Sequence, residues 1–211
     1  MRKTGFIALF LTACMLAAFT GCSTPTAKTA ESSVTSATSE SLDREHGAFL
    51  SHTYLEEYDT FEVTSSSLEN GVWIDITSNT HLGENNSPQL SWSPVEGASV
   101  YAIYMVDRNS NGFLHWKSNG ITETELPCGW APKLTEYNGP HLGHGYTHTF
   151  DIYVIALKAP VERLRGAING ANPKLDSFIQ ELDTDIDGNS GNIISYGKIS
   201  GEFTDARYRN T

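Results

Sequence analysis

The stretch from Gly139 to Leu157 constrains the fold more than any other part of this chain. It reads GPHLGHGYTHTFDIYVIAL, so turn-forming residues and histidines lead without a break into an apolar segment. Because successive side chains of a strand point to opposite faces, this pattern predicts a strand with one row of inward-facing side chains. The row consists of Tyr146, His148, Phe150, Ile152 and Val154. A titratable imidazole is therefore expected at the head of an apolar strand face.

A second strand that ends in a polar group lies upstream. The apolar run from Tyr101 to Val106 is followed by Asp107 and a short polar loop, after which another strand is expected to begin near His115 and Trp116. Other short strand patterns, separated by clusters of turn residues, occupy 71–77, 88–92 and 193–203. This spacing predicts a mostly β domain built from antiparallel sheets.

One segment departs from the strand pattern. Apolar residues between Val161 and Leu182 recur at near-helical intervals, but the sequence from Asn169 to Pro173 interrupts them. Because proline and its neighbours disfavour a continuous helix, the pattern predicts two short helices.

The N-terminus has the pattern of a bacterial lipoprotein signal. Two basic residues precede an apolar run over 6–19, which is too short to be a typical membrane span, and small residues then precede Cys22. Cys14 also follows a suitable pattern, but the apolar run before it falls below the usual ~7–15 residues. We therefore expect a signal peptide over residues 1–21, with an ordinary secretory leader as the alternative. Acylation of Cys22 would anchor the mature chain at the extracytoplasmic face of the cell membrane.

A segment with little capacity to fold follows Cys22. From Ser23 to Ser41, eleven of nineteen residues are Ser or Thr and none is aromatic. Such a segment buries too little apolar surface to offset its ordering entropy, so residues 22–51 are expected to form a flexible tether. The folded domain is expected over residues 52–208.

The charge balance excludes one class of partner. The formal net charge of −11 becomes −13 once the leader is removed, since the leader holds two basic residues and no acidic residue. A surface of this sign repels phosphate backbones, so binding to nucleic acid is not expected.

Several motifs follow one another in an order that is typical of a known family. They are SPQLSW, the apolar strand ending in Asp107, the pair His115 and Trp116, the pair Gly139 and Pro140, and HTFDIYVIAL from His148. This order resembles the phosphatidylethanolamine-binding protein family, above all its bacterial Raf-kinase-inhibitor-like branch. The resemblance implies an antiparallel β-sandwich with Greek-key features and one or two short peripheral helices. It also implies a small anion-binding pocket at one end of the sandwich.

The same resemblance implies which residues bind the ligand. Carried over position by position, they are Asp107, His115, Gly139, Pro140 and His148. The chain departs from the family pattern after Asp107, where the Asp-Pro-Asp-Ala-Pro loop is missing, so Asp107 matches either of the two family aspartates. Thr149 and Phe150 replace the Arg-Tyr pair that usually follows His148 in the family. One cation and one hydroxyl are thereby removed from the expected site.

These residue types suit a small anionic ligand. Imidazoles and turn amides donate hydrogen bonds to an anionic oxygen, and a carboxylate orients an imidazole or accepts from an amine. Phosphate or a phosphoethanolamine headgroup fits that mixture. The sequence has no nucleophile elbow, phosphate-binding loop or dinucleotide fingerprint, so we expect a binding protein without a cofactor rather than an enzyme.

Two alternative functions stay open. The resembled family includes protease inhibitors, so the domain is alternatively an interaction module that inhibits an extracellular protease. His141, His144 and His148, with Asp107 or His115, have the composition of a divalent-metal site of a hydrolase. Their segment reads as a loop, however, and histidine spacing indicates geometry only on a regular element.

The acidic stretch from Asp183 to Gly188 is a further motif to weigh. It copies the first half of a calcium-binding loop, including the glycine, but Ile194 occupies the position of the bidentate glutamate. A solvated acidic turn is therefore the favoured interpretation, and a weak calcium site is the alternative.

Overall fold

The computed structural model of this chain describes residues 53–143 and 145–205. The expected signal peptide, Cys22, the tether, His144 and both predicted domain boundaries lie outside these residues. No helix within the described ranges is long and apolar enough to cross a bilayer. The strands are β1 (Asp59–Phe61), β2 (Val63–Thr64), β3 (Leu68–Glu69), β4 (Val72–Trp73), β5 (Leu90–Trp92), β6 (Val100–Asp107), β7 (Phe113–Ile121), β8 (Glu125–Leu126), β9 (Thr147–Leu157) and β10 (Ile193–Thr204). The helical elements are α2 (Thr53–Glu56), η1 (Asp75–Thr77), α3 (Leu175–Gln180) and η2 (Glu181–Asp183).

The strands form two sheets. The larger has the order β3-β4-β10-β9-β6-β7, with β1 also paired to β10, and the smaller has the order β2-β5-β8. The long strands β10, β9, β6 and β7 pair antiparallel with one another, as expected from the sequence. In contrast, β1 and β4 run parallel to β10. The prediction of a mostly β sandwich is confirmed, but the larger sheet is mixed, because side-chain alternation is the same in both strand directions.

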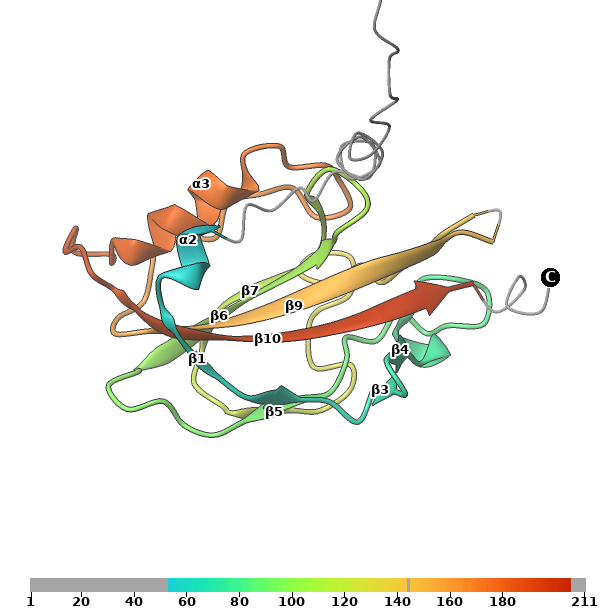
Figure 1. Ribbon diagram of the computed structural model, residues 1–211, viewed down its shortest axis with the longest axis horizontal. Coiled ribbons are helices and arrows are strands. Elements are labelled where there is room, and N and C mark those ends of the chain that lie inside the picture. Colours follow the sequence, from blue (N-terminus) through green and yellow to red (C-terminus); the bar gives the residue numbers. More distant parts are fainter. Residues whose placement is uncertain (1–52, 144, 206–211) are drawn as a thin grey trace, which may run out of the picture. The chain divides into compact units, whose positions relative to one another are not determined.

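The larger sheet is buried on both faces. Phe150, Ile152 and Val154 of β9 belong to a cluster with residues of β2, β5 and β8. Tyr153 and Ile155 point to the other face, where they belong to a cluster with residues of α2 and α3. Figure 1 shows α2 and α3 on one side of the long strands and β5 on the other. The predicted apolar row is confirmed for Phe150, Ile152 and Val154, whereas Tyr146 precedes the strand and is exposed. A second apolar row lies on the opposite face of β9.

The expected strand over 71–77 is only partly present. It is limited to β4, after which η1 forms over Asp75–Thr77. Both the backbone N–H and the hydroxyl of Thr77 donate to the carbonyl of Ile74, at 3.1 and 2.8 Å. A side chain that bonds to a nearby carbonyl in this way competes with strand pairing, which explains the difference.

The prediction of two separate helices over 161–182 is wrong in its first half. Helix α3 and the adjoining η2 occupy only its C-terminal part, and no helix forms over 161–174. In that part, carbonyl groups accept hydrogen bonds from sheet side chains instead of from a helix. Asn119 donates to the carbonyl of Val161 at 2.9 Å, and Lys117 donates to the carbonyls of Leu164 and Gly166 at 3.2 and 2.5 Å.

Candidate ligand pocket

Three neighbouring strands bring the expected polar residues to one end of the larger sheet. Asp107 is the last residue of β6, His115 lies near the start of β7, and His148 lies near the start of β9. Strand β6 pairs with both other strands, and Asp107 is opposite Phe113 on β7 and Phe150 on β9. The antiparallel arrangement therefore places a carboxylate between two histidine-bearing strands.

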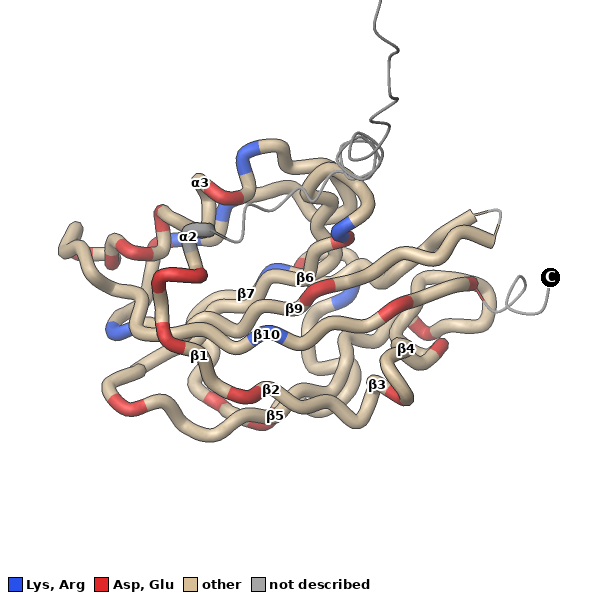
Figure 2. The backbone as a smooth tube through the Cα atoms, in the orientation of Figure 1, with Lys and Arg blue, Asp and Glu red and all other residues tan. Residues whose placement is uncertain are grey.

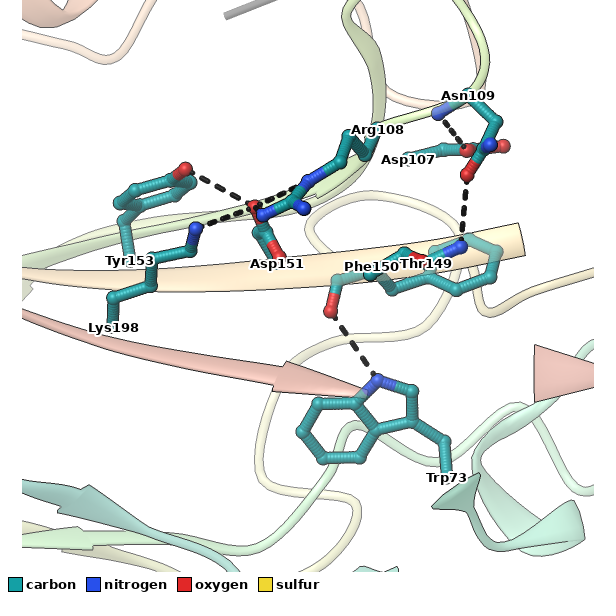
Figure 3. A network of polar contacts seen from close by, with 9 residues as sticks. All are labelled: Trp73, Asp107, Arg108, Asn109, Thr149, Phe150, Asp151, Tyr153 and Lys198. Carbon is teal, nitrogen blue, oxygen red and sulfur yellow. Dashed lines mark hydrogen bonds and ion pairs between the residues drawn. The ribbon is translucent and has the colours of Figure 1, made fainter. Parts of the chain in front are cut away.

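Asp107 and His148 form an ion pair if the imidazole is protonated. Nδ1 of His148 lies 2.6 Å from Oδ2 of Asp107, whose side chain is almost fully buried. The backbone N–H of Asn109 donates to the other carboxylate oxygen at 2.8 Å, and Oδ1 of Asn109 accepts from the N–H of Thr149 at 2.9 Å (Figure 3). Burial by itself raises the pKa of Asp107, but hydrogen bonds from His148, Ser110 and the Asn109 amide, with the His148 charge, lower it overall.

The loop after β6 is anchored by a second polar group. The guanidinium of Arg108 contacts Oδ2 of the buried Asp151 at 2.8 Å, and Nζ of Lys198 contacts the same oxygen at 2.9 Å (Figure 3). The hydroxyl of Tyr153 donates to this oxygen at 3.3 Å. Asp151 therefore ties the loop of β6 to β10 across β9.

A pocket of about 160 Å³ opens beside Asp107. It is lined by Asp107, Ser110, Phe113, His115, His141 and Leu142. A water molecule occupies roughly 30 Å³ in the liquid, so this volume suits a group of a few heavy atoms rather than a large organic ligand. Asp107 and His115 line the pocket as expected, whereas His148 contacts it only through Asp107 and Ser110.

His115 is held as a neutral hydrogen-bond acceptor. Its Nδ1 lies 2.7 Å from the carbonyl oxygen of Asn138, and since a carbonyl only accepts, Nδ1 carries the proton. Burial lowers the pKa of His115 to about 4. The neutral ring keeps a lone pair on Nε2, and it packs between Phe113 and Phe150 with ring centroids 5.1 Å away in each case. The expectation that this imidazole donates to an anion therefore does not fit its environment.

His141 is a second imidazole of the pocket, and its other ring nitrogen donates a hydrogen bond only when the ring is protonated. Its Nδ1 lies 2.9 Å from the carbonyl oxygen of Gly139, and its ring centroid lies 5.7 Å from that of His115. The residue is exposed at the mouth of the pocket. The sequence pattern indicated His141 only as a possible metal ligand, although its position directly after the Gly139–Pro140 turn was a usable signal for the pocket.

Gly139 and Pro140 position the pocket instead of lining it. Both are buried, and the N–H of Gly139 donates to Oδ1 of Asn85 at 2.7 Å. The carbonyl of Pro140 accepts from the N–H of Asn79 at 2.9 Å. A Cβ atom at position 139 would lie 2.0 Å from the carbonyl oxygen of Thr77. Glycine is therefore required here for close approach of two backbone segments, and its amide is not available to a ligand.

Ser110, His148 and Asp107 have the composition of a catalytic triad but not its geometry. The hydroxyl of Ser110 lies 3.4 Å from Nδ1 of His148, which is the same nitrogen that contacts Asp107. In a triad the serine and the carboxylate contact different ring nitrogens, so that the imidazole passes a proton between them. The arrangement here orients the imidazole and does not activate the serine.

Two further predicted sites would bind cations, namely the histidine-rich metal site and the acidic turn that resembles a calcium-binding loop. Across 53–143 and 145–205, no group of three His, Cys, Asp or Glu residues is close enough to bind a metal ion, and His144 lies outside these ranges. In the acidic turn, Oδ1 of Asp185 accepts from the amides of Asp187 and Asn189 at 2.9 and 2.8 Å. The carboxylate of Asp183 accepts from the amides of Gly191 and Ile193. Amides of the same loop thus occupy these carboxylates, which supports the interpretation as a solvated turn.

Comparison with known proteins gives matches at the level of structure. No protein-family model matches the sequence, and no curated protein matches it. The fold is similar to that of CT736 from Chlamydia trachomatis, described as a phosphatidylethanolamine-binding protein homologue, with a TM-score of 0.50 and 19% identity over 68% of this chain and 97% of that chain. It is also similar to E. coli YbcL, which is described as a new member of the mammalian phosphatidylethanolamine-binding protein family. The TM-score is 0.48, with 22% identity over 68% of this chain and 97% of that chain. The resemblance inferred from the motifs is thus confirmed for the fold, and this chain has the fold of the phosphatidylethanolamine-binding proteins.

Proposed function

We propose that this domain binds a small ligand with a phosphate or another anionic group in the pocket beside Asp107. The observation that carries this proposal is the pair of Asp107 and His148 next to a pocket lined by Ser110, His115 and His141. These side chains offer hydrogen-bond donors and acceptors within a space that admits only a small group. Binding, without turnover, is the proposed activity, since the imidazole of His148 is oriented rather than placed for proton relay.

The charges of the pocket favour a zwitterion over a simple anion. Among the described residues, no Lys or Arg lines the pocket, and the groups there that can carry positive charge are the imidazoles. The Ser110 hydroxyl and protonated His141 suit the oxygens of a phosphate, whereas Nε2 of His115 and the carboxylate of Asp107 suit an ammonium group. A phosphoethanolamine headgroup carries both groups. Inorganic phosphate satisfies the donors alone and is expected to bind more weakly.

The proposed location follows from the N-terminus. With Cys22 acylated and residues 22–51 acting as a tether, the domain would stay close to the extracytoplasmic face of the cell membrane. The pocket would then meet ligands of the cell exterior or of the membrane surface.

Titration of the full-length protein with phosphoethanolamine, followed by NMR of the imidazole resonances, tests this function. Saturable shifts of His141 and His148 are expected, and inorganic phosphate should produce the same shifts only at higher concentration.

Matched variants identify the site. His141→Ala should weaken phosphoethanolamine binding at least tenfold, while His81→Ala, at an exposed histidine that does not line the pocket, should leave it unchanged. Equal effects of the two substitutions, or shifts that never saturate, would exclude the proposed pocket.

A further inference from the structure

A second, wider groove lies on the other face of the larger sheet. Lys117 is opposite Tyr104 in the pairing of β7 with β6, and Tyr104 belongs to the cluster that packs with α3. The groove has a volume of about 550 Å³. Its lining consists of Lys117, Arg163, Leu164, Arg165, Gly166, Ala167, Asn172 and Phe178. It shares no residue with the pocket beside Asp107.

Three cations gather in this groove although the chain is acidic. The full sequence has 25 Asp and Glu against 14 Lys and Arg, and Figure 2 shows the acidic residues spread over most of the described chain. Among the described residues, no carboxylate lines the groove itself, although both arginines also line a neighbouring hollow that contains Glu162, Glu181 and Asp185. Of these described carboxylates, only Glu181 forms an ion pair with one of the cations, through Nε of Arg165 at 2.7 Å. About two positive charges are therefore left without a carboxylate partner among the described residues.

The backbone holds these cations in place. Nζ of Lys117 donates to the carbonyls of Leu164 and Gly166, and the hydroxyl of Tyr104 donates to the carbonyl of Arg165 at 3.1 Å. These bonds use two of the three N–H groups of the ammonium, so the third stays available. The segment that carries both arginines is thus fixed to the sheet on each side of position 165.

The cations also repel one another. Burial lowers the pKa of Lys117, and the charge of Arg163 lowers it further. Arg163 is exposed and forms no ion pair with another described residue. An anion in the groove would relieve this repulsion while keeping both side chains charged.

We propose that this groove is a second binding site, for a dianionic oxyanion such as a phosphate group. Lys117 would contact it through its free N–H, and the guanidinium groups of Arg163 and Arg165 would bind its oxygens as planar forks. Phosphate near neutral pH carries about the charge that the groove leaves unpaired. The partly buried ring of Phe178 gives an apolar wall for the rest of a larger phosphorylated ligand.

The test uses inorganic phosphate and the full-length protein at pH 7. Saturable shifts are expected at the backbone amides of 163–167, and potassium chloride at equal ionic strength should not produce them. Arg163→Gln should weaken this binding about tenfold, because a charge-assisted hydrogen bond is lost. Lys174→Gln is the control, since Lys174 is an exposed cation nearby in the sequence that does not line the groove.

The site can be separated from the pocket beside Asp107. His141→Ala should leave the shifts at 163–167 unchanged, so the groove and the pocket can fail independently. Shifts that chloride reproduces, or equal weakening by Arg163→Gln and Lys174→Gln, would overturn the proposal. Arg163 forms no described ion pair, so its substitution is not expected to unfold the chain.

Discussion

Nδ1 of His148 lies 2.6 Å from Oδ2 of Asp107, and the two residues come from adjacent strands, 41 positions apart in the chain. This contact joins the end of β6 to the start of β9. Because the carboxylate is nearly fully buried, its hydrogen bonds and charge partner matter more than those of an exposed pair.

Removing the imidazole should leave this buried carboxylate short of a partner. His148→Ala is expected to lower the free energy of unfolding by about 1–3 kcal/mol at pH 7. Denaturant unfolding of both single variants and of the Asp107→Asn/His148→Ala double variant measures the coupling. Purely additive effects would mean that the two side chains do not interact.

The contact between Asp107 and His148 also predicts that the stability of the fold decreases at acid pH. The lowered pKa of Asp107 means that its contribution to stability is present above its ordinary value near 3.8 and is lost as pH falls below it. Asp107→Asn should therefore reduce the loss of stability between pH 4 and pH 2. An unchanged acid unfolding curve would contradict the lowered pKa.

The burial of His115 should make the stability of the fold depend on pH at milder acidity as well. Its pKa is lowered to about 4 by burial, whereas the unfolded chain binds the proton near its ordinary value of 6.5. The unfolded state therefore holds more protons in this interval, and stability should fall as pH drops from 6.5 to 4, by up to roughly 3 kcal/mol. In urea unfolding at several pH values, His115→Gln should remove this part of the dependence. His81→Gln, at an exposed histidine, should keep it.

Gly139 is expected to be intolerant of any side chain. Gly139→Ala places Cβ 2.0 Å from the backbone oxygen of Thr77, so the two segments must separate, at a cost of about 1–3 kcal/mol. Separation would also move the carbonyls that orient His115 and His141, so ligand binding should weaken too. Gly143→Ala is the matched control, because an added Cβ there meets nothing within 4 Å. Equal stability of the two variants in thermal unfolding would contradict the packing argument.

The core and the tether should differ sharply in their contribution to stability. Ile152 is fully buried in β9, so Ile152→Ala is expected to lower the free energy of unfolding by about 2–5 kcal/mol. Deleting residues 22–45 should leave it unchanged, because that segment has little apolar surface. Denaturant unfolding of both variants measures this. A large loss on deletion would place the domain boundary further upstream.

The lipoprotein prediction is tested by fractionation. Cys22→Ser should move the protein from the membrane fraction to the soluble fraction, because the acylated thiol is the expected anchor. Mass spectrometry should show an acylated N-terminus only in the parent protein. An unchanged distribution and mass would contradict acylation at Cys22.

The sequence alone determined much of this protein. Alternation in β9 identified the row of Phe150, Ile152 and Val154 because burial of one face imposes a period of two, and these three side chains pack in the core as expected. The same reasoning placed Asp107 and the two histidines at strand ends, which an antiparallel sheet brings together. The parallel pairing of β1 and β4 with β10 was not predictable, since direction leaves no trace in the alternation of side chains.

Only the tertiary structure decided what each polar group does. Whether His115 donates or accepts depends on the carbonyl of Asn138, a residue 23 positions away, and on burial that removes its charge. Gly139 looked like a ligand-binding turn, but contact with Thr77 makes it a packing position. Likewise, Lys117, Arg163 and Arg165 form a groove because side chains of the sheet hold the carbonyls of 161–166. Local sequence sets strand and turn preference, whereas the charge state and availability of a group depend on contacts between distant segments.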